Sequence, residues 1–194
     1  MLYQFLLNFV DIFGFLNVFK YITFRTGLSL FTSLIIVLLV GGPFIKYFSN
    51  KKITNPIRND GPEDHIIKKI GTPTMGGLII LFGLLVSVLC WGDLSNISIL
   101  FCIYISISFG LLGAMDDYKK IKYNNSSGIS FKFKILSQIF LAVLGVSFFV
   151  YFVDYQEITN LYFPFFKNLV INLGWFFIPF SAFVIIGSSN AVNL

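Results

Sequence analysis

The chain has 194 residues, of which 56% are hydrophobic and only 12% are charged, and its formal net charge is +5. An ordinary soluble domain is about 45–50% apolar and about 25% charged, so the composition excludes that class and predicts a membrane protein with several spans. No basic run is interleaved with exposed aromatic residues, and nucleic acid is therefore not an expected partner. The basic excess bears instead on the orientation of the loops.

Residues 1–20 are apolar but carry Gln4, Asn8 and Asp11 at helical spacing, which predicts an amphipathic helix lying in the membrane interface. A further spanning helix is the alternative there.

Each apolar run after residue 20 approaches the ~20 residues that cross the hydrocarbon layer as a helix. The expected spans are 28–45, 75–91, 97–115, 135–153 and 173–187. Pro179 should kink the last of these spans.

These spans predict an all-α polytopic membrane protein, with about five transmembrane helices and an N-terminal interfacial helix in a single membrane domain over residues 1–194. Six Lys and Arg residues lie in segment 46–74 and five in segment 116–134, against three on the other side of the membrane: Lys20, Arg25 and Lys167. By the positive-inside rule, the two basic segments are cytoplasmic. The polar segments 55–77, 113–120 and 188–194 are then expected on one membrane face.

Asp116 and Asp117 stand where the third apolar run ends and a basic stretch begins. We place them at the C-terminal end of that helix, where a carboxylate costs up to ~1 kcal/mol against the helix dipole. One interpretation is a solvated helix end balanced by Lys119 and Lys120. The other is a carboxylate site for Mg²⁺, which takes one or two protein carboxylates together with substrate phosphates.

Segment 71–77 reads Gly-Thr-Pro-Thr-Met-Gly-Gly and leads directly into the second span, close to Lys69. A helix N-terminus with two hydroxyls and a lysine is suited to binding an anion, although a capped helix start beside lipid head groups fits equally well.

Asn190 and Asn193 lie three residues apart after the last span. Their amides could bind a base or a sugar, or else cap the helix. His65, the only histidine, is expected to be a surface residue.

These segments together resemble the phospho-N-acetylmuramoyl-pentapeptide transferases. The stretches that carry the resemblance are RNDGPEDH (58–65), GTPTMGG (71–77), MDDY (115–118) and NAVNL (190–194), with NVFKYITFRTGLSL (17–30) also similar. The aspartate pair alone fits the wider superfamily of polyprenyl-phosphate N-acetylhexosamine-1-phosphate transferases, whereas the first two stretches are much more specific to the muramoyl-pentapeptide branch.

The resemblance implies transfer of phospho-N-acetylmuramoyl-pentapeptide from its UDP conjugate to undecaprenyl phosphate, with release of UMP, in the bacterial cytoplasmic membrane. It implies Mg²⁺ as cofactor and a homodimer in the lipid bilayer. It also implies catalytic roles for Asp116 and Asp117, with Asp116 at the lipid phosphate and Asp117 at the metal. Lys69, Thr74, Asn190 and Asn193 match family positions that line the nucleotide pocket.

Members of this family are about twice as long and have about ten spans, and their NAVNL stretch continues into TDGLDG. A third catalytic aspartate and a histidine-rich loop follow later in them. We therefore expect the 194-residue chain to be the N-terminal half and to be inactive by itself. The rival hypotheses are a sister transferase that uses UDP-N-acetylglucosamine and a non-catalytic integral membrane protein. The latter would carry charged residues in mid-span, and spans two to four contain none.

Overall fold

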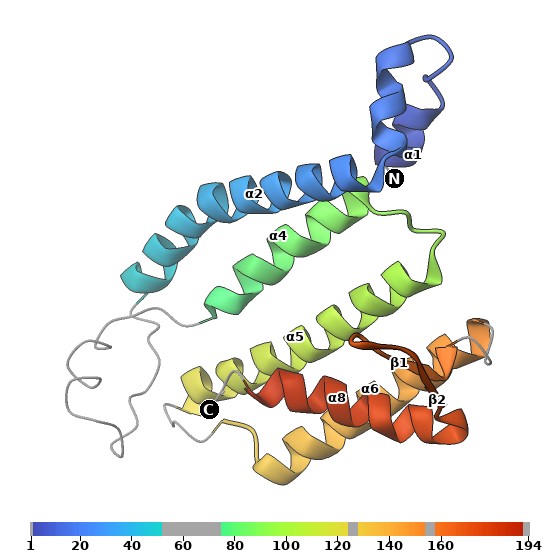
Figure 1. Ribbon diagram of the computed structural model, residues 1–194. Helices are drawn as coiled ribbons and strands as arrows, with labels where there is room; N and C mark the ends of the chain where they lie inside the picture. Colours follow the sequence, from blue (N-terminus) through green and yellow to red (C-terminus); the bar gives the residue numbers. More distant parts are fainter. Residues whose placement is uncertain (1, 52–74, 124–127, 154–157, 192–194) are drawn as a thin grey trace. The chain divides into compact units, whose positions relative to one another are not determined.

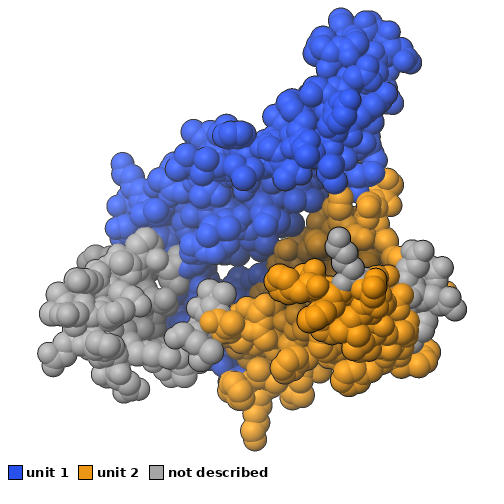
Figure 2. Space-filling model, in the orientation of Figure 1, with its two compact units in different colours: residues 1–94, 110–130 blue, residues 95–109, 131–194 orange. Residues whose placement is uncertain are grey.

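The structure is a computed structural model that describes residues 2–51, 75–123, 128–153 and 158–191 (Figure 1). The chain forms two compact units, residues 1–94 with 110–130 and residues 95–109 with 131–194 (Figure 2). Helix α5 (Ile97–Tyr123) contributes residues to both. The prediction of a single membrane domain stays a prediction.

The first unit is built on two antiparallel apolar helices, α2 (Ile22–Asn50) and α4 (Gly76–Trp91), which lie side by side (Figure 1). They approach closely because Gly83 has no side chain, and a Cβ there would lie 2.9 Å from Val37 Cγ2 and 3.2 Å from the Ser33 carbonyl oxygen. Small residues allow this kind of contact between membrane helices. At the C-terminal end of α4, the Trp91 indole donates a 2.9 Å hydrogen bond to Thr32 Oγ1.

The second unit has α6 (Phe131–Phe152) as its most buried helix and α8 (Phe177–Ala191) packed against it. Its buried positions fall on one helical face, with Ala142 and Val146 almost wholly enclosed. Between α6 and α8 in the chain come an antiparallel hairpin of β1 (Asn160–Phe163) and β2 (Phe166–Asn172) and the 3₁₀ turn η2 (Gly174–Phe176). Asn172 ties hairpin and turn together, because its side chain bonds Thr159 Oγ1 at 3.0 Å and accepts from the Gly174 N–H at 2.9 Å.

The described residues include four helices long and apolar enough to cross a membrane, together with the shorter apolar helix α4. This confirms the predicted fold class of about five spanning helices. The 16 residues of α4 extend roughly 24 Å at 1.5 Å per residue. The hairpin was not predicted, although Pro164 and the β-branched residues Val170 and Ile171 are typical of a turn and a strand.

The N-terminal segment is not one helix. It divides into α1 (Leu2–Leu7) and the 3₁₀ helix η1 (Gly14–Lys20). After Leu7 the backbone bonds change to the tighter three-residue spacing, as from the Asn8 N–H to the Phe5 carbonyl. The weak helix formers Asn8, Asp11 and Gly14 explain the break. Placement of this segment in the membrane interface stays a prediction.

Helix ends differ from their predicted positions in several places, and α2, for example, covers Ile22–Asn50 and not 28–45. Pro179 is the third residue of α8, where its missing N–H breaks no intrahelical bond, so it marks the start of the helix and not a kink inside the span. Helix α5 runs to Tyr123 and not to Met115, so Asp116 and Asp117 do not end the helix. The turns of α5 beyond Met115 are stabilised by an Asp116–Lys120 ion pair at i,i+4 and by Lys120 and Lys122, which lie near the negative end of the helix dipole.

Gly83→Ala is expected to destabilise the first unit by about 1–3 kcal/mol, since the added methyl forces α2 and α4 apart. The control is Gly41→Ala in α2, where a Cβ meets no atom within 4 Å. In that variant the better helix propensity of alanine should leave stability unchanged or raise it by up to about 1 kcal/mol. Thermal unfolding in detergent compares the two variants, and equal melting temperatures would contradict the close contact.

Candidate functional site

The aspartate pair lies on the part of α5 that belongs to the first unit. Asp116 is only 9% exposed, and both of its carboxylate oxygens have partners. Oδ1 accepts a 2.7 Å hydrogen bond from the Ile129 backbone N–H, and Oδ2 lies 2.6 Å from Lys120 Nζ. Burial of a carboxylate is unfavourable unless it is paired and hydrogen-bonded. Asp116 meets both conditions.

Lys120 lies between the two carboxylates. Its Nζ is also 3.5 Å from Asp117 Oδ1, one helical turn back on the same helix. The Asp117 side chain is 30% exposed and that of Asp116 only 13%. Lys120 reaches both carboxylates because it follows them by four and three positions on the helix, and the Asp117 carboxylate is the more accessible of the two from outside. The pair is therefore divided into an inner and an outer carboxylate.

Two described residues that follow α5 in the chain, Gly128 and Ile129, also lie against Asp116. Gly128 adopts a left-handed backbone conformation, with φ of +60°, which L-residues other than Asn and Asp rarely adopt. A Cβ at this position would overlap Asp116 Oδ1 and would lie 2.9 Å from both Asp116 Cγ and Lys120 Cε. The next residue, Ile129, is 4% exposed and supplies the N–H that Asp116 accepts. The turn thus depends on a glycine for both its conformation and its close approach.

The side chains at this site could supply only some of the ligands of a hard cation such as Mg²⁺. Among the residues that the structure describes, no three His, Cys, Asp or Glu side chains come together in a way that could hold a metal ion. Each Asp116 oxygen already has a partner, Lys120 or the Ile129 N–H, so this carboxylate is the less available of the two to a metal ion. Asp117 fits a site of the Mg²⁺ type, in which one or two protein carboxylates are completed by water and phosphate oxygens.

Asn190 lies in the last turn of α8, in the second unit, where it pairs with Gln138 of α6. Asn190 Nδ2 donates to Gln138 Oε1 at 2.9 Å and to the Ile186 carbonyl at 3.0 Å, and Gln138 Nε2 donates back to Asn190 Oδ1 at 3.4 Å. Gln138 is 2% exposed. The amide of Asn190 is therefore fixed by a second helix and is not simply a helix cap.

Lys69, Thr74 and Asn193, the other predicted site residues, lie outside the described residues, as does His65. The described part of the glycine-rich segment begins at Met75, the residue that precedes α4, which has a left-handed φ of 65°. Gly76 and Gly77 open α4, and a Cβ added to either would meet no atom within 4 Å. The prediction that these segments share one site with the aspartates stays a prediction.

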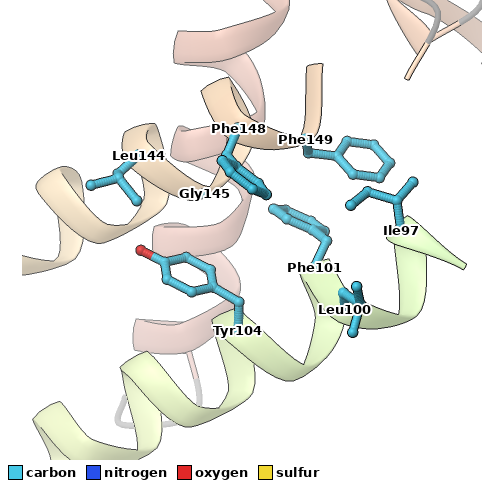
Figure 3. Close-up of a pocket in the computed structure, with 8 residues that line it drawn as sticks. All are labelled: Ile97, Leu100, Phe101, Tyr104, Leu144, Gly145, Phe148 and Phe149. Atoms are coloured by element: carbon cyan, nitrogen blue, oxygen red, sulfur yellow. The ribbon is translucent and has the colours of Figure 1, made fainter. Parts of the chain in front are cut away.

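A separate cavity of about 220 Å³ lies in the second unit between α5 and α6 (Figure 3). Its lining residues are Ile97, Leu100, Phe101, Tyr104, Leu144, Gly145, Phe148 and Phe149. The one polar side-chain group among them, the Tyr104 hydroxyl, donates a 3.2 Å hydrogen bond to the Leu141 carbonyl. The cavity lining holds no carboxylate, imidazole, amine or thiol, so it offers no group suited to phosphoryl chemistry.

Comparison with known proteins assigns a family to these features. The glycosyl transferase family 4 profile matches residues 96–194, which are 99 of the 194 residues and include both aspartates. The chain belongs to glycosyl transferase family 4. Signature 1 of phospho-N-acetylmuramoyl-pentapeptide-transferase matches residues 69–81, which cover the predicted Lys69, the glycine-rich segment and the start of α4. The chain falls in this branch of the family, as the resemblance predicted.

Among the proteins similar to this chain are three that carry the name phospho-N-acetylmuramoyl-pentapeptide-transferase. The protein of Pelagibacter ubique strain HTCC1062 is 66% identical over 194 residues, which are all of this chain and 54% of the relative. That of Thermodesulfovibrio yellowstonii is 46% identical, again over all of this chain and 54% of the relative. That of Caulobacter vibrioides is 43% identical over 92% of this chain and 50% of the relative. The chain thus spans about half the length of the curated relatives it matches.

Several residues around the predicted site were not found from the sequence. Lys120 was noted only as a counter-charge for a solvated helix end, although its i,i+4 spacing from Asp116 was a usable signal. Gly128 and Ile129 follow Asp116 by 12 and 13 positions across a turn, and no periodicity links such positions. Gln138 was not singled out within its apolar run, and its partner is 52 residues away.

Gln138→Leu should lower stability by about 1 kcal/mol, because it removes an interhelical hydrogen bond of a strength usual in membrane proteins and leaves the Asn190 amide without that partner. The double variant Gln138→Leu/Asn190→Leu is the control, since replacing both partners by apolar groups can be nearly neutral. Thermal unfolding in detergent compares both with Asn190→Leu alone. Additive losses would contradict a direct pair.

Proposed function

We propose that the gene product containing this chain transfers phospho-N-acetylmuramoyl-pentapeptide from its UDP conjugate to undecaprenyl phosphate and releases UMP. The observation that carries the proposal is the aspartate pair on α5, one carboxylate enclosed and the other more exposed, with a lysine between them. Membership of the family and the signature over residues 69–81 support the substrate class. The proposal concerns the complete gene product, because the relatives that bear this name are about twice as long as the part matched here.

The proposed reaction is a phosphoryl-centred substitution. An oxygen of the lipid phosphate attacks the phosphorus attached to the sugar, a new P–O bond forms, and the bond to the UMP oxygen breaks. A phosphate monoester has a second pKa near 6, so the nucleophile is already largely ionised at neutral pH. Positioning and charge neutralisation then matter more than a strong general base. A covalent aspartyl phosphate is the other route compatible with two carboxylates.

We propose Asp117 as the metal ligand, since its side chain is more exposed than that of Asp116 and lies beside the Asp116–Lys120 ion pair. Mg²⁺ bound there would neutralise charge on the phosphates of the two anionic substrates. Asp116 is proposed to hold its carboxylate beside the lipid phosphate, oriented by Lys120 and the Ile129 N–H. Lys120 supplies a cation that reaches both carboxylates and adds positive charge next to the reacting phosphates.

The nucleotide is proposed to bind Lys69, Thr74, Asn190 and Asn193. The signature over residues 69–81 supports the first two. Asn190 is supported by its fixed orientation, because Gln138 holds its amide at the end of α8.

We further propose that the active face is the cytoplasmic side of the bacterial membrane, in line with the excess of lysine and arginine in residues 46–74 and 116–134. We also propose that the protein acts as a homodimer.

The rival substrate is UDP-N-acetylglucosamine, used by sister transferases. The match to the muramoyl-pentapeptide signature favours the muramoyl conjugate. Purified gene product incubated with radiolabelled undecaprenyl phosphate and each UDP-sugar in turn tests the choice. We expect a lipid-linked product and UMP only with the muramoyl-pentapeptide conjugate. Product only from UDP-N-acetylglucosamine would overturn the substrate assignment.

Asp117→Asn is expected to abolish transfer, lowering kcat by at least about 10²-fold, because it removes the charge proposed to hold the metal. Membrane insertion should be preserved, since the carboxylate is at a helix surface and an amide has the same shape. Asp11→Asn is the matched control, because Asp11 is exposed in the N-terminal turn, and it should retain wild-type turnover. Wild-type turnover in Asp117→Asn would contradict the assigned role.

Removal of divalent cations with EDTA should stop transfer, and Mg²⁺ should restore it. Ca²⁺ should restore much less activity, because it prefers more ligands at longer distances than Mg²⁺ does. Release of UMP measures both conditions. Full activity in EDTA would contradict a metal-dependent reaction while leaving the substrate assignment intact.

A further inference from the structure

We propose that Gly128 is a positioning residue of the transfer reaction: its left-handed turn brings the Ile129 N–H onto Asp116, and its missing side chain leaves the space that the Asp116 carboxylate occupies. This inference rests on the proposed function for its kinetic consequence. Its structural basis, the contact between residue 128 and Asp116, is independent of which substrate is used.

The first argument is conformational. The φ of Gly128 is +60°, a region in which most L-residues are strained by roughly 1–2 kcal/mol. This conformation turns the chain at the point where Ile129 must present its N–H to Oδ1 of Asp116 at 2.7 Å. Ile129 is 4% exposed, so its side chain anchors the far side of the turn. Glycine is therefore the residue best suited to position 128, because it adopts this conformation without strain and lets the Ile129 N–H reach Asp116.

The second argument is steric. A Cβ at position 128 would overlap Asp116 Oδ1 and would stand 2.9 Å from Lys120 Cε. A single added methyl group would thus press on the carboxylate and on its counter-ion together. Asp116 is 9% exposed, which leaves its side chain little room to move aside. The carboxylate would have to rotate away from Ile129, from Lys120 or from both.

A displaced Asp116 should slow the chemical step more than it weakens substrate binding. Misplacement of a reacting group by about 1 Å can cost about 10²-fold in rate. The residues proposed to bind the nucleotide are elsewhere in the sequence and do not include the turn. A defect at Gly128 is therefore expected in kcat, while KM for the UDP-sugar stays within about threefold.

The kinetic test compares Gly128→Ala and Gly128→Asn with Gly113→Ala in the complete gene product. Gly113 lies one turn before Asp116 on α5, and a Cβ there meets no atom within 4 Å. Both Gly128 variants should lose roughly 10–100-fold in kcat, and Gly113→Ala should retain the wild-type value. Asn tolerates the left-handed region, so full activity of Gly128→Asn would show that overlap with Asp116 is unimportant and would overturn the proposal. Unchanged kcat in Gly128→Ala would do the same.

A stability cycle provides a readout that does not need activity. Gly128→Ala is measured by thermal unfolding in the wild-type protein and in Asp116→Ala, where the overlapping carboxylate is gone. The melting temperature should fall more in the wild-type background than in Asp116→Ala, because only the former contains the contact. Equal falls would overturn the proposal. If the wild-type protein transferred neither sugar, the proposed function would fail, and this cycle would still decide the contact.

Discussion

The arrangement of the site depends on one electrostatic constraint: a carboxylate is enclosed in helix α5, directly after its apolar stretch. Asp116 is 9% exposed, and an enclosed charge without partners would cost several kcal/mol. Lys120 and the Ile129 N–H offset that cost from two sides, one from the same helix and the other from the turn after it. The helix must therefore continue at least to Lys120, and the backbone at Gly128 must bring the Ile129 N–H onto Asp116. The length of α5 and the conformation of Gly128 are both tied to this one buried charge.

The membrane environment imposes a second constraint on the polar residues of the apolar helices. Gln138 is buried in α6, and its amide is satisfied by Asn190 of α8. In the same way the Trp91 indole bonds Thr32. Each of these bonds joins two helices, since an unpaired polar group in hydrocarbon is unfavourable. Polar residues inside apolar runs are thus informative about packing, and Asn190 illustrates that a residue proposed for substrate binding is also held by a neighbouring helix.

The sequence sufficed to predict what depends on composition and local spacing. Apolar length located the helices, and the improbability of two adjacent carboxylates in a chain with 12% charged residues singled out Asp116 and Asp117. Helix ends were less predictable: α5 continues to Tyr123 because Lys120 stabilises the extra turns, and α2 begins at Ile22, six residues before the expected start. Contacts across a turn or between helices, such as Gly128 with Asp116 or Gln138 with Asn190, depend on tertiary geometry that no local pattern encodes.

Adjacent carboxylates on one continuous helix diverge by about 100°, and the cation that reaches both here, Lys120, lies 2.6 Å from Asp116 but 3.5 Å from Asp117. The continuation of α5 past the pair therefore favours separate roles for the two aspartates. The inner one, Asp116, is committed to Lys120 and Ile129 and can act through a fixed orientation. The outer one, Asp117, is the better candidate for a cation whose remaining ligands are substrate phosphates and water. If this division holds, substitutions around the two carboxylates should differ in kind: the residual activity of Asp117→Asn should need a higher Mg²⁺ concentration for its half-maximal rate, whereas a change at Gly128 or Lys120 should lower turnover without raising that concentration.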